Sequence, residues 1–97
     1  NARVLEDRVN ALVAERPQLA HLVLLCSAIN DIDASALESL EAINQRLVDA
    51  GVCLHMSEVK GPVMDRLQGT DLLNHLNGQV YLTHFQAVSE LAPDMLK

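Results

Sequence analysis

Residues 30–37 carry the side chains best suited to chemistry or recognition. Asp31, Asp33 and Ser35 alternate along this segment, just before or at the start of a helical apolar pattern. Helix capping explains these residue types, because Asp and Ser are favoured N-caps and acidic groups suit a helix N-terminus. The alternative is a modification or contact site, since a phosphate on Ser35 would meet free backbone N–H groups. Asp31, Asp33 and Glu38 would repel that phosphate, so it would act mainly by repelling an acidic partner.

A second candidate segment consists of Lys60, Gly61 and Pro62. Proline is favoured at the first position of a helix, so this segment is expected to open one. A lysine beside a helix N-terminus offers a cation and free N–H groups to an anion. A solvated loop explains the same residues, and a lone lysine does not distinguish the two interpretations.

Motifs of the common catalytic and cofactor sites do not occur in the chain. Ser35 lacks the flanking glycines of a nucleophile elbow, and no glycine-rich phosphate-binding loop is present. The histidines show no metal-ligand spacing and are expected at the surface or at strand ends. These histidines are His21, His55, His75 and His84. We expect no catalysis, no metal and no cofactor.

Composition excludes further classes of function. The 97 residues are 49% hydrophobic and 21% charged, which is typical of one globular domain. A net charge of −6 and an aromatic content of 2% argue against binding to nucleic acid or to anionic lipid. No apolar stretch approaches the roughly 20 residues that span a bilayer, so we expect no membrane insertion of this segment. Cys26 and Cys53 lie in apolar runs and are expected to be reduced core residues in the cytosol.

Helical periodicity and short apolar runs alternate along the chain. The predicted strands cover residues 22–26, 52–57 and 79–81. The predicted helices cover residues 1–15, capped by Asn1, and 35–50, followed by Gly51. Further on, a helix runs from Lys60–Pro62 to Gly69, a helical turn lies within 70–77, and a last helix is capped by Thr83 and ended by Pro93. In the last helix, Phe85, Val88 and Leu91 are expected to face the core.

This alternation predicts an α/β fold, a layered structure with a small, mainly parallel sheet and about four helices. The run over residues 22–26 is uniformly apolar, as in strands buried on both faces. Function in such sheets collects at the carboxyl ends of the strands. The loops 28–36, 59–62 and 82–83 should therefore share one rim, with Ser35 and Lys60 on it.

The order and spacing of several segments resemble the STAS domain, which sulfate permease-type anion transporters share with anti-sigma-factor antagonists. The matching segments are residues 1–3, 32–40, Gly51 with 52–56, 60–67 and 81–83. Residues 60–67 resemble the transporter branch, and the short connection 16–18 resembles bacterial members. The resemblance covers nearly the whole chain, so residues 1–97 are interpreted as one STAS domain.

The resemblance implies a non-catalytic regulatory and protein-interaction domain of a bacterial sulfate permease-type transporter. It implies a place at the cytoplasmic face of the inner membrane, with the membrane domain of the same transporter or a cytosolic protein as partner. The expected contact residues lie in the two candidate segments. They are Asp31, Asp33, Ala34, Ser35, Ala36, Leu37, Lys60, Gly61, Pro62 and Val63.

Two alternatives remain at this point. In the antagonist branch the serine matching Ser35 is the phosphoacceptor of a free-standing switch, but Ala34 and Ala36 depart from the residues usual there. An aspartyl-phosphate receiver needs acidic residues from different strands, whereas Asp31 and Asp33 lie in one loop.

The family fold begins with two strands that precede the helix expected at residues 1–15. The domain is therefore expected to be incomplete at its N-terminus, and its exposed sheet edge is expected to invite pairing with another chain.

Overall fold

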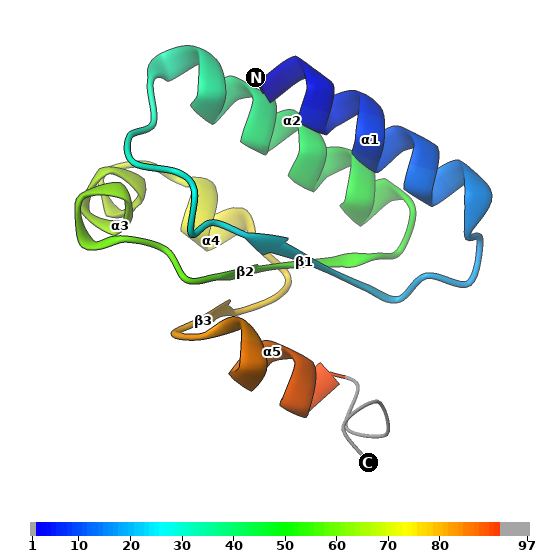
Figure 1. Ribbon diagram of the computed structural model, residues 1–97. Helices are drawn as coiled ribbons and strands as arrows, with labels where there is room; N and C mark the ends of the chain where they lie inside the picture. The colour runs from blue at the N-terminus through cyan, green and yellow to red at the C-terminus, as the bar shows by residue number, and fades with distance from the viewer. Residues whose placement is uncertain (1, 92–97) are drawn as a thin grey trace.

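Three parallel strands form the sheet in the computed structural model, which describes residues 2–91 (Figure 1). Strand β1 (His21–Leu25) pairs with β2 (Cys53–Ser57), and β2 pairs with β3 (Val80–Tyr81). The sheet order is β1-β2-β3. The carboxyl ends of all three strands therefore meet at one edge, and the predicted α/β fold with a small parallel sheet is confirmed.

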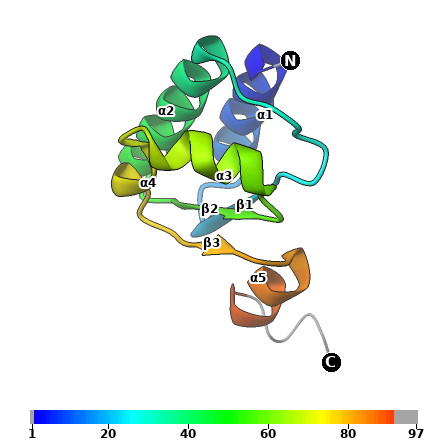
Figure 2. The same ribbon diagram turned by 90° about the vertical axis from the view of Figure 1, so that its left-hand side faces the viewer.

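Helices connect the strands and cover the sheet. They are α1 (Ala2–Glu15), α2 (Ala34–Asp49), α3 (Gly61–Gln68), α4 (Leu72–His75) and α5 (His84–Leu91). Helices α1 and α2 lie side by side on one face of the sheet, and α5 lies on the opposite face (Figures 1 and 2). The described residues form five helices rather than about four, because the helical turn expected within residues 70–77 is a helix of its own, α4. None of the five is both long and apolar enough to cross a membrane.

The two faces of the sheet differ in their side chains. Leu24 and Met56 point into the core, which consists of two clusters of buried side chains. One cluster joins β2 to α1 and α2, and the other, which contains Met56, joins it to α2, α3 and α4. The opposite face carries Val23 and Leu25, and Leu25 remains 47% exposed. The expectation that this strand is buried on both faces is therefore wrong. The exposure of β1 follows from its position in the sheet. Among the described residues it pairs only with β2, and α5 contacts its second face.

Most helix ends lie where the sequence indicates. Gly51 follows the last turn of α2 with a φ of +75°, a left-handed conformation that a side chain would strain. Thr83 caps α5, because its Oγ1 accepts the Gln86 N–H at 3.0 Å. The expected cap at Asn1 and the end at Pro93 lie outside the described residues.

Helix α5 is rotated from the orientation that its apolar spacing predicts. Phe85 is 71% exposed, so its expected place in the core is wrong. Ala87 is fully buried instead, and Val88 and Leu91 are half-buried. His84 fixes the start of the helix, because its N–H bonds to Glu58 in the loop after β2 and its ring bonds to Ser57 of β2. These two bonds set which side of α5 faces the sheet.

Candidate functional site

The loop between β1 and α2 presents the side chain of Asp31 to solvent, whereas Cys26 and Ile32 of the same loop are buried. Asp31 is exposed, and its Oδ1 accepts the Ile32 N–H at 2.8 Å. Ile32 is only 3% exposed and belongs to the core beneath α2. Cys26 at the start of the loop is fully buried, and its N–H donates to the Ser57 carbonyl at 2.9 Å. The loop is therefore anchored at both ends while its acidic residue faces solvent.

Capping accounts for Asp33. Its backbone is extended, and its Oδ1 accepts the Ala36 N–H at 2.7 Å, so Asp33 is the N-cap of α2. Ala34 and Ser35 occupy the first two positions of the helix and are exposed. Ala36 and Leu37 pack against the core and are half-buried. Ser35 thus presents its hydroxyl to solvent at the helix end where backbone N–H groups are free.

The loop after β2 meets the loop after β1. The Lys60 Nζ donates a hydrogen bond to Asn30 Oδ1, which joins the carboxyl ends of neighbouring strands. The lysine is also the N-cap residue of α3 through its carbonyl, which accepts the Met64 N–H at 2.8 Å. Gly61 and Pro62 are exposed, whereas Val63 is buried at 1% exposure and packs in the core. Val63 therefore holds the loop in place and offers little surface to a partner.

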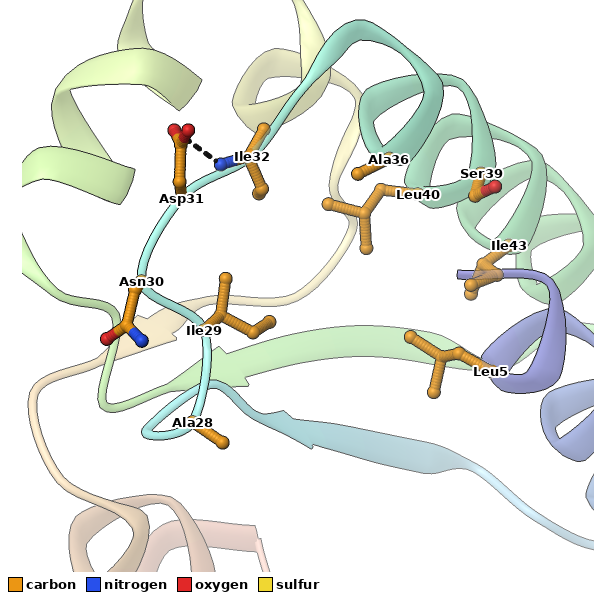
Figure 3. A pocket seen from close by; sticks show the side chains of 10 residues that line it. All are labelled: Leu5, Ala28, Ile29, Asn30, Asp31, Ile32, Ala36, Ser39, Leu40 and Ile43. Carbon is orange, nitrogen blue, oxygen red and sulfur yellow. Dashed lines mark hydrogen bonds between the residues drawn. The ribbon is translucent and has the colours of Figure 1, made fainter. Parts of the chain in front are cut away.

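A cavity of about 420 Å³ lies beside the β1–α2 loop (Figure 3). It is walled by α1, by the loop after β1 and by α2, and its lining is mostly apolar. The lining residues are Leu5, Ala28, Ile29, Asn30, Asp31, Ile32, Ala36, Ser39, Leu40 and Ile43. Sequence analysis missed this cavity because Leu5 and Ile43 lie on different helices, and no local pattern predicts how α1 and α2 pack.

A third set of contacts ties α5 to the same rim. Glu58 has a φ of +54°, and its Oε2 accepts the His84 N–H at 3.1 Å. The Ser57 Oγ lies 2.9 Å from His84 Nδ1. The loops after β2 and β3 are therefore fastened to each other. The sequence alone assigned Glu58 no role, although it is a charged residue directly after a buried strand that ends in a serine.

The histidine prediction holds only in part. His21 and His75 are exposed, but His55 is 4% exposed in the middle of β2, so its expected surface position is wrong. It is retained in the interior because its ring nitrogens lie within hydrogen-bond distance of His21 and of the Gln79 N–H. Within residues 2–91, no three His, Cys, Asp or Glu side chains are grouped so as to hold a metal ion.

Comparison with protein-family models decides the family. Residues 1–87 match the model of the STAS domain. The chain belongs to the STAS family. A search of curated proteins finds no significant match. In this STAS domain, Asp33 caps α2, Ser35 lies in its first turn, and the bond between Lys60 and Asn30 joins the loops after β1 and β2.

Proposed function

We propose that this STAS domain is a non-catalytic regulatory and protein-interaction module of a sulfate permease-type anion transporter. It would act at the cytoplasmic face of a bacterial inner membrane, on the membrane domain of its own transporter or on a cytosolic protein. The observation that carries the proposal is the hydrogen bond from Lys60 to Asn30, which joins the two loops from which the candidate contact segments continue. The resemblance of residues 60–67 to the transporter branch supports the choice of branch.

The chemistry of the rim supports contact with a protein. Asp31 and Asp33 are exposed carboxylates, and the whole chain carries a net charge of −6. The apolar cavity beside them would take an aliphatic or aromatic side chain. A partner surface that combines apolar and basic side chains fits both features.

The roles of the rim side chains also support a non-catalytic function. Asp31 and Asp33 each accept a backbone N–H, in a turn and in a helix cap. Lys60 is bonded to a neutral amide rather than to an acid or a hydroxyl. These contacts fix the shape of the loops, which is what a docking surface requires.

Binding of the domain to the transporter's membrane domain tests the proposal. Asp33→Asn removes the charge but keeps a good helix cap, and Ser35→Glu adds charge at an exposed position. Toward a partner with basic side chains, Asp33→Asn should weaken binding about three- to tenfold and Ser35→Glu should strengthen it by a similar factor, as expected for charges at the edge of an interface. Asp49→Asn, at the far end of the same helix, removes an equal charge and should leave binding unchanged. Unchanged binding of both rim variants would refute docking at this rim.

A free-standing phosphoswitch is the second candidate function. It is favoured by the exposure of Ser35 in the first turn of α2, where a kinase could reach the hydroxyl. Incubation with a partner kinase and labelled ATP distinguishes the two functions. Label that is lost in Ser35→Ala, together with loss of partner binding after phosphorylation, would support the switch. Membrane spans encoded upstream of Asn1 in the same reading frame would support the transporter.

A further inference from the structure

Two imidazoles form a pair on the face of the sheet that α5 occupies, away from the rim. His21 Nδ1 and His55 Nε2 lie 3.0 Å apart, and the ring centroids are 5.1 Å apart. His21, at the start of β1, is exposed, whereas His55 is 4% exposed. The Gln79 N–H, just before β3, lies 3.0 Å from His55 Nδ1. The His55 ring, on the central strand, therefore contacts both β1, through His21, and the segment that leads into β3, through Gln79.

The Gln79 amide fixes where the protons of both rings lie. A backbone N–H can only donate, so His55 Nδ1 must accept and carries no proton. A neutral His55 then has its proton on Nε2, which donates to His21 Nδ1. His21 in turn carries its proton on Nε2. The chain of hydrogen bonds from Gln79 through His55 to His21 is complete only when both imidazoles are neutral.

Protonation of either ring places two donors face to face. A proton added to His55 goes to Nδ1 and points at the Gln79 N–H, whereas one added to His21 points at the His55 Nε2–H. Burial first, and the neighbouring His21 second, lower the pKa of His55 below its usual value. The addition of a proton at His55 therefore works against the fold.

In the part of the chain that the structure describes, no carboxylate hydrogen-bonds to either ring of the pair. Cys53 lies opposite His21 in the register of β1 and β2. Tyr81 of β3 has its ring centroid 5.8 Å from that of His55, and burial first, with Glu90 of α5 second, raises the pKa of its phenol. Within residues 2–91 the ring nitrogens of His55 bond to His21 and to the Gln79 N–H, and no carboxylate bonds to them to balance an imidazolium.

Gln79 is also the first attachment of β3 to β2. Its carbonyl accepts the Met56 N–H at 3.0 Å, and β3 itself is two residues long. Gly78 packs so closely on β2 that an added Cβ would lie 2.2 Å from the Leu54 carbonyl oxygen and 2.6 Å from His55 Nδ1. Any movement of His55 away from Gln79 is therefore transmitted to the start of β3, and through β3 to α5.

We propose that the His21–His55 pair is an acid-sensitive latch that fastens β3 and α5 to the sheet when both imidazoles are neutral. Proton uptake breaks the bond to Gln79 or the bond between the rings, and residues 78–81 then separate more readily from β2. The layer of α1 and α2 on the other face stays closed, because Leu22 and Leu54 pack against it from the sheet. The latch is independent of docking at the rim.

Zinc binding is the competing use of the two rings. A metal ion at His55 Nε2 needs the lone pair of that atom, which would move the proton to Nδ1 and point it at the Gln79 N–H. Metal binding at His55 therefore breaks the same bond to Gln79 that protonation breaks, and the response to added Zn²⁺ distinguishes the two.

Amide hydrogen exchange by NMR at pH 7.5 and 5.5 tests the latch on the chain as it stands. After correction for intrinsic exchange, the amides of Gln79, Met56 and Glu58 should exchange about tenfold faster or more at the lower pH. The amides that join β1 to its neighbour, those of Cys26 and Cys53, should change much less. Equal changes at all five amides, or none, would overturn the proposal.

Variants separate the latch from a general effect of acid. In His55→Gln the new side chain can accept from Gln79 but cannot titrate, so the acid response of these amides should be lost. His21→Gln, at an exposed position, should reduce the acid response of these amides. This variant replaces His55→Gln in the test if the buried substitution prevents folding. His75→Gln is the matched control, because this exposed histidine bonds to Glu41 on another surface, and it should respond as the parent does. A full response in His21→Gln, or stabilisation of the parent by added Zn²⁺ that His21→Gln abolishes, would refute the latch.

Discussion

Cys26 directly follows β1, and Cys53 is the first residue of β2. The two thiols differ in their access to solvent. Cys26 is fully buried, its Sγ donates to the Leu24 carbonyl at 3.4 Å, and burial raises the pKa of its thiol to about 11. Cys53 is half-buried. Both thiols are free, as the sequence predicts for reduced cysteines.

Alkylation at pH 8 should therefore label Cys53 first. A pKa two units above the ordinary 9.0 leaves Cys26 with about 100-fold less thiolate, and burial blocks the reagent further. Peptide mapping by mass spectrometry measures the two rates. In Cys53→Ser the single remaining thiol should react slowly until urea unfolds the chain. Rapid labelling of that variant in native buffer would show that Cys26 is accessible.

At the scale of single elements, α2 offers the sharpest test of local physics. The Asp33 Oδ1 bond to the Ala36 N–H satisfies one free donor at the start of the helix. Asp33→Ala should lower the free energy of unfolding by about 1 kcal/mol, measured by urea denaturation. Asp33→Asn and Asp33→Ser keep a capping oxygen and should lose much less. An equal loss in all three variants would assign the effect to charge rather than to capping.

The elements themselves could be predicted closely from sequence, because each depends on local patterns. The apolar run at residues 22–26 gave β1 to within one residue, and Gly51 marked the end of α2. The predictions from sequence failed where tertiary packing determines whether a side chain is buried. The exposure of Phe85 depends on how His84 is held, and the burial of His55 depends on a partner 34 residues earlier, His21, and on Gln79. The cavity beside the β1–α2 loop escaped for the same reason, since its walls come from separate elements.

For the whole molecule, titration of the buried groups should give a stability that falls on both sides of neutral pH. His55 has a lowered pKa in the folded state, so the unfolded chain binds more protons between that value and the ordinary one near ~6.5. The free energy of unfolding therefore falls as the pH drops through that range. Cys26 acts in the opposite sense, because its raised pKa makes the folded chain bind more protons between 9.0 and about 11. Stability should therefore also fall as the pH rises beyond 9.

Urea unfolding followed by circular dichroism from pH 5 to pH 8 measures the acid limb. The midpoint should decrease below about pH 6.5 in the parent and in His75→Gln, because both retain His55 in its buried site. His55→Gln should show a shallower decrease, since the unfolded chain no longer gains a proton that the folded state resists. If His55→Gln instead follows the parent over the whole range, the acid sensitivity must come from other groups. The burial of this one imidazole would then have no consequence for the stability of the domain.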